Sequence, residues 1–338
     1  MRIPATPLVL ALALNGTTSL AGDAGSTTAA VSPVEVVETM EKNFGIHPGM
    51  RRNHAKGVCA TGTFTATPEA ATLSRSPLFS GKPLPVTARF SLAGGRPATP
   101  DTTRSPRGMA LRYTLPNGSF HMMAMLNVPV FGAATPTTFL DSLKAGSPDP
   151  ATGKPDPEKL RAFAASHPDA RNLADFLKAN NPPVAYTATP YFGLHAFRLV
   201  DGKGQGRWVR WHFSPRDAAA NLDDAALAAA PANFLEPRLQ ERVAKGSVKW
   251  DMIVTLAEAG DTLTDPSIPW PAGRKEVRVG TLELDKVESQ AGGSCDKINF
   301  DPMVMSDGVE PSDDPILRFR SAAYAVSFGK RLSDAPTK

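Results

Sequence analysis

Residues 51–57 read Arg51-Arg52-Asn53-His54-Ala55-Lys56-Gly57, a compact basic run with one histidine at its centre. From Lys56 onward the periodicity changes from helical to alternating, and residues 57–67 follow directly as a predicted β-strand. A single histidine in a basic run is weak evidence of function, because a surface histidine has the same pattern. Whether this histidine is functional therefore has to be judged from segments further along the chain.

The composition is that of an ordinary soluble globular protein. The chain has 338 residues, of which 41% are hydrophobic and 21% charged, and this length is enough for a sizeable core. The 32 prolines favour loops over a helical bundle. The sequence pI is ≈ 9.1, but the basic residues are scattered and no nucleic-acid motif accompanies them. We therefore interpret the charge as serving solubility together with an anionic ligand, and not a nucleic acid.

The first 21 residues have the pattern of an export signal. Arg2 makes the start positive, residues 7–14 (PLVLALAL) are apolar, and residues 19–21 (SLA) form a small-x-small cleavage pattern. A buried N-terminal helix is the alternative. The apolar run is too short to span a bilayer. We expect a signal peptide cleaved near Ala21, a periplasmic protein, and no membrane association.

Eight stretches after Lys56 have the alternation and the bounding turn residues of β-strands. They span residues 57–67, 85–92, 108–115, 120–131, 193–200, 208–213, 249–256 and 275–284. Apolar spacing predicts helices at residues 33–44, 156–180, 217–243 and 314–332. A closed barrel uses this many strands without open edges. We expect an α+β fold, an antiparallel eight-stranded β-barrel with surrounding helices, as a single domain (residues 44–338) after an N-terminal segment (residues 22–43).

Cys59 and Cys295 are the two cysteines of the chain. Disulfides persist outside the cytoplasm, so a bridge between them is one interpretation. Two buried free thiols are the other. Two cysteines at this separation do not make a structural zinc site of the usual pattern.

Three segments far apart in the chain contain the residues that point to chemistry. They are Arg51-x-x-His54, the ARFS stretch at 88–91 with the RSPRG turn at 104–108, and Arg320-x-x-x-Tyr324, preceded by FDP at 300–302 and GVEPS at 308–312. In this order the segments resemble the haem catalases, and most of all the short, exported catalase-related peroxidases. The matching segments run from about residue 44 to residue 332.

Arg320 and Tyr324 are four residues apart on the predicted final helix and therefore share one face. The guanidinium can hydrogen-bond the phenol oxygen and favour the ionised form of a group whose ordinary pKa is about 10. The alternative is a surface contact within the helix. The resemblance implies that Tyr324 is the axial ligand of the iron of haem b, tyrosine being the ligand known for catalases.

The resemblance also implies roles for polar residues around the haem. His54 is expected to take a proton from the peroxide and return it to the departing oxygen, and Ser91 to orient the imidazole. Three arginines are expected to pair with the two propionates, because buried anions require cations; they are Arg51, Arg89 and Arg331. Each of these residues has a plain structural alternative, as a strand serine or a solvated arginine.

Asn127 lies where the chain departs from the family pattern. Catalases have Asn-Asn-Thr-Pro on the distal side, whereas residues 125–131 read Met-Leu-Asn-Val-Pro-Val-Phe. Aligned on Pro129, Leu126 takes the position of the catalytic asparagine. A shift of one residue would give that role to Asn127, which is the candidate. Loss of the amide would favour one-electron peroxidase turnover over oxygen release. Phe139 matches an aromatic residue that lies over the haem.

The implied function is that of a haem-dependent peroxidase. It would reduce hydrogen peroxide or organic peroxides with a small organic reductant, and would have weak catalase activity. Two alternatives use the same scaffold: a haem enzyme that converts fatty-acid hydroperoxides, and a haem-binding protein with degraded catalysis. Neither Gly-x-Ser-x-Gly nor His-Glu-x-x-His occurs, which disfavours a hydrolase. The chain stops soon after Arg331, without the C-terminal helical domain of large catalases, so a homo-oligomer is left open.

Overall fold

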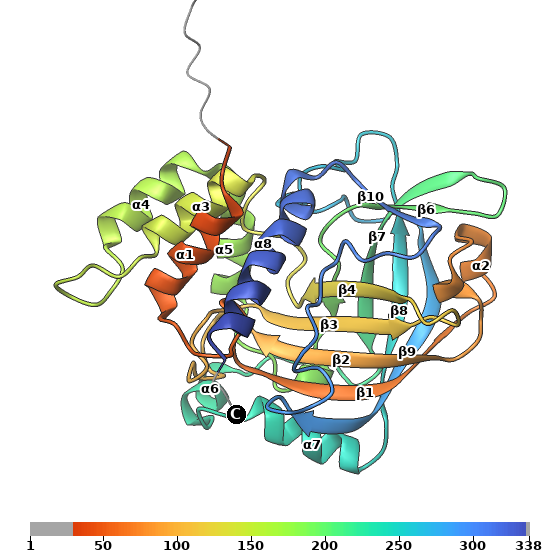
Figure 1. Ribbon diagram of the computed structural model, residues 1–338, viewed down its shortest axis with the longest axis horizontal. Coiled ribbons are helices and arrows are strands. Elements are labelled where there is room, and N and C mark those ends of the chain that lie inside the picture. The colour runs from red at the N-terminus through yellow and green to blue at the C-terminus, as the bar shows by residue number, and fades with distance from the viewer. Residues whose placement is uncertain (1–29, 336–338) are drawn as a thin grey trace, which may run out of the picture. The chain divides into compact units, whose positions relative to one another are not determined.

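The computed structural model describes residues 30–335. The predicted signal peptide, residues 1–21, lies outside the described residues. From Val31 onward the chain is one compact unit. Helix α1 (Pro33–Phe44), predicted with these bounds, belongs to that unit, because it packs against α8 (Pro315–Ser333) and α3 (Pro136–Ala145) (Figure 1). Within residues 30–335 no helix combines the length and the apolar character needed to cross a membrane.

A closed antiparallel β-barrel forms the centre of this unit, as predicted. Its strands, in order round the barrel, are β1 (Gly57–Ala66), β2 (Leu84–Leu92), β3 (Arg107–Thr114), β4 (Phe120–Leu126), β5 (Tyr191–Phe192), β7 (Gly206–Pro215), β8 (Val248–Leu256) and β9 (Glu276–Ser289). Pairing of β9 with β1 and of β7 with β8 closes the ring. Two further strands, β6 (Phe197–Val200) and β10 (Val309–Pro311), extend the sheet from β7.

The side chains of β2, β3 and β4 divide between the two faces of the barrel wall. Alternation along a strand sends neighbouring side chains to opposite faces. One cross-strand row lies in the buried core of the barrel: Phe90, Met109 and Met125. The adjacent row must face outward, and it consists of Ser91, Gly108 and Leu126. This outward row forms one wall of the site described below.

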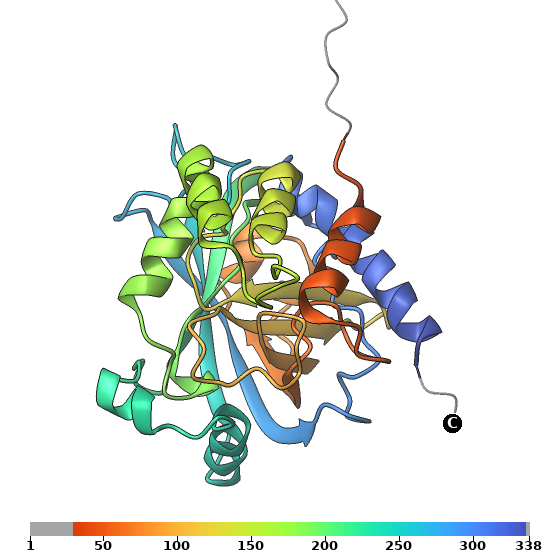
Figure 2. The ribbon, with the colours of Figure 1, turned by 90° about the vertical axis from the view of Figure 1, so that its left-hand side faces the viewer.

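Helices α1, α3 and α8 pack together on one side of the barrel, and α5 (Arg171–Ala179) lies on the same side (Figures 1 and 2). The helix predicted over residues 156–180 is two helices, α4 (Pro157–Ser166) and α5. Pro168 interrupts them because proline removes a donor and clashes with the preceding turn.

The helix predicted over residues 217–243 is likewise shorter and divided. It consists of α6 (Asp224–Ala229) and α7 (Leu235–Ala244), with Pro231 between them. Helix α3 and the single turn α2 (Ala70–Leu73) were not predicted. The signal for α3 is a helix N-cap: the Thr135 hydroxyl accepts a hydrogen bond from the backbone N–H of Thr138 at 3.1 Å, and Pro136 follows it.

Cys59 and Cys295 form a disulfide with their Cα atoms 5.3 Å apart, which confirms the first of the two interpretations. The bond joins β1 to the segment that follows β9. That segment begins at Gln290 and also supplies the backbone carbonyls that contact two arginines of the site.

Candidate active site

A cavity of about 340 Å³ lies between the outer face of β2–β4 and helices α1, α3 and α8. A volume of this order is usual for a site that takes a small molecule or cofactor. Eight of the nine predicted site residues line it: Arg51, His54, Arg89, Ser91, Phe139, Arg320, Tyr324 and Arg331. The structure therefore brings together residues from both ends of the chain. Asn127 is the exception.

His54 is fixed by contacts on its backbone and on its ring. It has φ 54°, a left-handed conformation that is uncommon for a residue with a Cβ. Its N–H donates to Asn53 Oδ1 at 2.9 Å, and its carbonyl accepts from Arg89 Nη2 at 2.6 Å. Ring Nδ1 lies 2.9 Å from Ser91 Oγ. Among residues 30–335 nothing bonds Nε2, which leaves this nitrogen for a ligand in the cavity.

The His54–Ser91 pair depends on the absence of a side chain at Gly108. A Cβ at Gly108 would lie 2.6 Å from Ser91 Oγ and 3.2 Å from both Cε1 and Nδ1 of His54. The first distance is shorter than any van der Waals contact allows. Gly108 therefore has a role in the site, which the sequence reasoning missed.

The His54 imidazole is neutral over the physiological pH range. Burial, followed by the positive charges of Arg89, Arg320 and Arg51, lowers its pKa to about 3. When Nδ1–H donates to Ser91 Oγ, Nε2 holds a lone pair that can accept a proton. The geometry thus leaves one ring nitrogen free to accept a proton, on an imidazole whose other nitrogen contacts Ser91 Oγ.

Tyr324 ends a chain of four hydrogen-bonded side chains. Its Oη accepts from Arg320 Nη2 at 2.6 Å, and Arg320 Nη1 lies 3.1 Å from His195 Nε2. His195 Nδ1 in turn lies 2.6 Å from Asp314 Oδ2, and both of these residues are 1% exposed. Burial lowers the pKa of His195, against the opposing effect of Asp314. A neutral His195 donates to Asp314 and accepts from Arg320, which holds the guanidinium against the phenol oxygen.

His195 and Asp314 were not predicted as site residues. His195 lies in the stretch 193–200, whose resemblance to the family was seen without a role being assigned to it. Asp314 precedes Pro315 and caps α8, its Oδ1 accepting from Ile316 N at 2.8 Å. The N-cap pattern predicts the contact of Asp314 with the start of α8. It does not predict the contact of Asp314 with His195, which is 119 residues away.

Three arginines form a cluster with an excess of positive charge. Arg89 is 3% and Arg331 6% exposed, and Arg51 is half-buried. Burial lowers the pKa of each; that of Arg51 falls to about 8 because Arg89 and Arg331 add repulsion. Among residues 30–335, Asp296 is the one carboxylate bonded to them, at 3.2 Å from Arg331 Nη2. Arg89 bonds the neutral amide of Gln290, and Arg51 bonds backbone carbonyls.

These features fit a buried planar cofactor with two carboxylates. The arginine cluster has the charge to neutralise them, since each buried anion requires a cation. Tyr324 offers an oxygen ligand on α8, and His54 lines the same cavity from the run that precedes β1. Most of the remaining wall is apolar, with Phe139, Leu126 and Met40 among its members.

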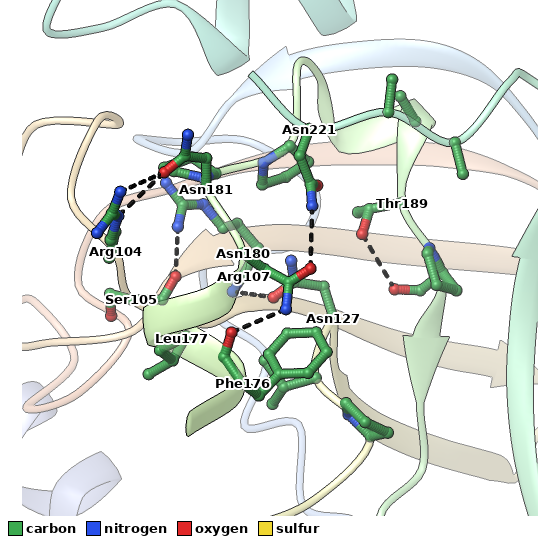
Figure 3. A pocket seen from close by; sticks show the side chains of 18 of the residues that line it. Arg104, Ser105, Arg107, Asn127, Phe176, Leu177, Asn180, Asn181, Thr189 and Asn221 are labelled. Carbon is green, nitrogen blue, oxygen red and sulfur yellow. Dashed lines mark hydrogen bonds between the residues drawn. The ribbon is translucent and has the colours of Figure 1, made fainter. Parts of the chain in front are cut away.

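The structure does not bring Asn127 to this cavity. Asn127 Oδ1 accepts from Arg107 N at 2.7 Å, and Asn127 N donates to Arg107 O at 2.8 Å (Figure 3). These bonds hold the amide in a second cavity, which is lined by Arg104, Asn180 and Asn221 (Figure 3). Leu126 lines the first cavity instead. The predicted distal role of Asn127 would require a shift of one residue, and the structure does not have this shift. Alternation along β4 places Leu126, and not Asn127, in the wall of the first cavity.

Comparisons with known proteins point to one family and one fold. The family model for catalase matches residues 19–336. A catalase-related peroxidase from Synechococcus elongatus is 52% identical over 95% of this chain and 96% of its own, and one from Mycolicibacterium paratuberculosis is 36% identical over 88% and 94%. In fold, catalase A from Saccharomyces cerevisiae superposes with a TM-score of 0.76 at 23% identity, over 84% of this chain and 61% of that chain.

Proposed function

The chain belongs to the catalase family, and from this premise we propose that it is a haem-dependent peroxidase. Its substrates are hydrogen peroxide or organic peroxides, and its reductant is a small organic molecule. The observation that carries the proposal is the arrangement of one cavity, with the free Nε2 of His54 in one part of its wall and the Arg320-bonded Tyr324 in another. The relatives named catalase-related peroxidases support it.

The residues that would hold haem b are Tyr324, whose phenol oxygen would bind the iron, and Arg51, Arg89 and Arg331, which would pair with the propionates. The cofactor, when bound, supplies a redox-active iron that the side chains themselves lack. Arg320 holds the phenol oxygen of Tyr324 in place by a hydrogen bond at 2.6 Å. Phe139 and the other apolar residues exclude water from the cavity.

His54 moves the proton in this mechanism. Its Nε2 accepts a proton from one oxygen of hydrogen peroxide and returns it to the other as the O–O bond breaks, so that this second oxygen leaves as water. Over the whole reaction the organic reductant supplies the two electrons and two protons that convert the first oxygen to water as well. Burial and the three nearby arginines keep the imidazole neutral before the peroxide binds. Ser91 Oγ, at 2.9 Å from Nδ1, fixes the tautomer and the ring orientation.

Leu126 sets the balance between the two reactions of this family. An aliphatic side chain offers no hydrogen bond to a second peroxide molecule, so oxygen release is expected to be slow relative to oxidation of a reductant. The ratio of oxygen evolved to reductant oxidised, measured with hydrogen peroxide, tests this. Oxygen evolution that dominates at saturating reductant contradicts it.

The variant Tyr324→Phe tests the proposed function directly. It removes the oxygen ligand but keeps the ring, so we expect the tyrosinate-type haem spectrum to disappear and peroxidase turnover to fall by at least about 10–100-fold, the usual cost of disturbing a metal site. Tyr113→Phe is the matched control, because Tyr113 is a buried barrel tyrosine outside the cavity. An unchanged spectrum and turnover in Tyr324→Phe would contradict the proposal.

We also propose that the protein is exported to the periplasm. The Cys59–Cys295 disulfide supports this, because such bonds persist in oxidising compartments. Mass spectrometry of the protein from a periplasmic extract should find a mature chain that begins near residue 22. An intact residue 1 on the active protein would contradict the proposal.

A further inference from the structure

Asn53 lines the same cavity as His54, and its amide has a defined orientation. One terminal atom of the amide accepts two backbone N–H groups, from His54 at 2.9 Å and from Gly94 at 2.8 Å. A backbone N–H can only donate, so this atom is the oxygen and Nδ2 occupies the other position. Nδ2 donates to no atom among residues 30–335, and the residue is half-buried. Two N–H donors of a residue that lines the cavity are therefore left without a partner among the described residues.

The outward strand row beside His54 offers no amide donor. The outward row Ser91, Gly108 and Leu126 places an aliphatic side chain at its end, and Asn127 bonds Arg107 in another cavity. A peroxide in the cavity needs hydrogen-bond donors for the oxygen on which negative charge develops as the O–O bond breaks. The described residues next to His54 offer such a donor through Asn53 Nδ2.

We propose that Asn53 Nδ2 donates a hydrogen bond to the peroxide beside His54 and so supplies the amide donor that Leu126 does not. The proton still travels from one oxygen to His54 Nε2 and then to the departing oxygen; Asn53 keeps its own protons. This role rests on the proposed peroxidase function. Because Asn53 Oδ1 also anchors the backbone of His54, one residue orients both the base and the substrate.

The variant Asn53→Asp separates the two tasks of this side chain. Aspartate keeps an oxygen acceptor for the N–H groups of His54 and Gly94 but has no donor to offer a ligand. We expect thermal unfolding and haem uptake like those of the unsubstituted protein. The affinity of the haem-loaded protein for fluoride, a small anion that accepts hydrogen bonds, and kcat/KM for hydrogen peroxide should both fall by about 10–100-fold.

Two further variants control for the added charge. Asn299→Asp places a carboxylate in the same cavity on the segment that follows β9, and we expect it to change fluoride affinity by less than about 3-fold. Leu126→Asn in the Asn53→Asp background should recover part of the lost affinity, since it restores an amide. A double variant no better than Asn53→Asp, or an equal loss in Asn299→Asp, overturns the proposal.

A measurement on the unsubstituted protein does not depend on any variant folding. In the cyanide complex of the haem-loaded protein, proton NMR should show a hyperfine-shifted side-chain NH₂ pair assigned to Asn53 by selective ¹⁵N labelling. Absence of the shift, or unchanged fluoride affinity in Asn53→Asp, overturns the role of Asn53 alone. Failure of the unsubstituted protein to take up haem or to consume peroxide overturns the proposed function instead.

Discussion

His54 is held on every side except the one that faces the cavity. Its backbone N–H donates to the Asn53 amide oxygen, and its carbonyl accepts from the Arg89 guanidinium. Its ring Nδ1 contacts the Ser91 hydroxyl. These three contacts maintain a left-handed backbone conformation that costs on the order of 1 kcal/mol or more for a residue with a side chain. The strain thus serves to aim Nε2, and the residues that compensate for it are themselves part of the cavity wall.

The residue-scale prediction concerns Gly108. In Gly108→Ala, the new methyl group would meet Ser91 Oγ at 2.6 Å, so the serine or the imidazole must move. We expect peroxidase kcat/KM to fall by about 10–100-fold, since a small misplacement of a catalytic group has an effect of this size. The midpoint of urea unfolding should change little.

Gly202→Ala is the matched control for this substitution, because its added methyl group would meet no heavy atom within 4 Å. It should leave both the midpoint and kcat/KM unchanged. Full activity of Gly108→Ala would show that the Ser91–His54 contact tolerates displacement and does not orient the base.

At the scale of elements, the alternating pattern predicted the strands but not where the polypeptide leaves the sheet. The strand predicted over residues 120–131 ends at Leu126, because Asn127 turns to bond Arg107 and Phe131 N bonds Pro266 O at 2.9 Å. Both bonds are made across long stretches of sequence, and nothing in the local pattern anticipates them. The wrong prediction for Asn127 has the same cause. Asn127 lies just beyond the end of β4, and where the strand ends decides which cavity its side chain lines.

The segment that follows β9 is the part of the structure that loss of the disulfide would affect most. Cys295 anchors it to β1, and its carbonyls at Cys295 and Ile298 accept from Arg51 Nη2 at 3.1 and 2.8 Å. Asp296 bonds Arg331 in the same segment. Replacing both cysteines by serine should lower the free energy of unfolding by about 2–5 kcal/mol.

The same double variant should weaken haem binding, because the arginines lose fixed partners when the segment is no longer anchored. Denaturant unfolding and a haem titration of the apoprotein measure the two effects. Haem affinity that is unchanged in a clearly destabilised variant would show that the disulfide stabilises the barrel without positioning Arg51 and Arg331.

At the scale of the whole molecule, barrel closure determines which distant residues meet. The Arg320–Tyr324 pair follows from helical spacing alone, and the structure has it at 2.6 Å. His195 and Asp314 complete that pair only because β6 and the start of α8 are neighbours, β10 pairing with β6 at Phe197 just before α8 begins. No spacing rule connects residues 119 apart, so the barrel and the helix pair were predictable and the full chain of four side chains was not.

The whole molecule should lose stability as the pH falls from about 7 to 5, because buried histidines are neutral in the folded state. Burial lowers the pKa of His121 to about 4, and burial with three arginines lowers that of His54 to about 3. An unfolded chain titrates its histidines near pH 6.5. Between these values the unfolded state binds more protons, so the free energy of unfolding decreases as pH falls. The lowered pKa values of His195 and His212 act in the same direction.

His121 offers the cleanest test of this dependence, because it lies outside the cavity. Its Nδ1 lies 3.0 Å from Ser306 Oγ, and Nε2 has no partner among the described residues. His121→Asn keeps a polar atom near the Nδ1 position and cannot titrate, so it should reduce the slope between pH 6 and 5 by up to about 1.4 kcal/mol per pH unit. Urea unfolding followed by tryptophan fluorescence at pH 7, 6 and 5 measures it, in a range where carboxylates stay ionised. A variant whose slope equals that of the unsubstituted protein would show that His121 is already protonated in the folded state.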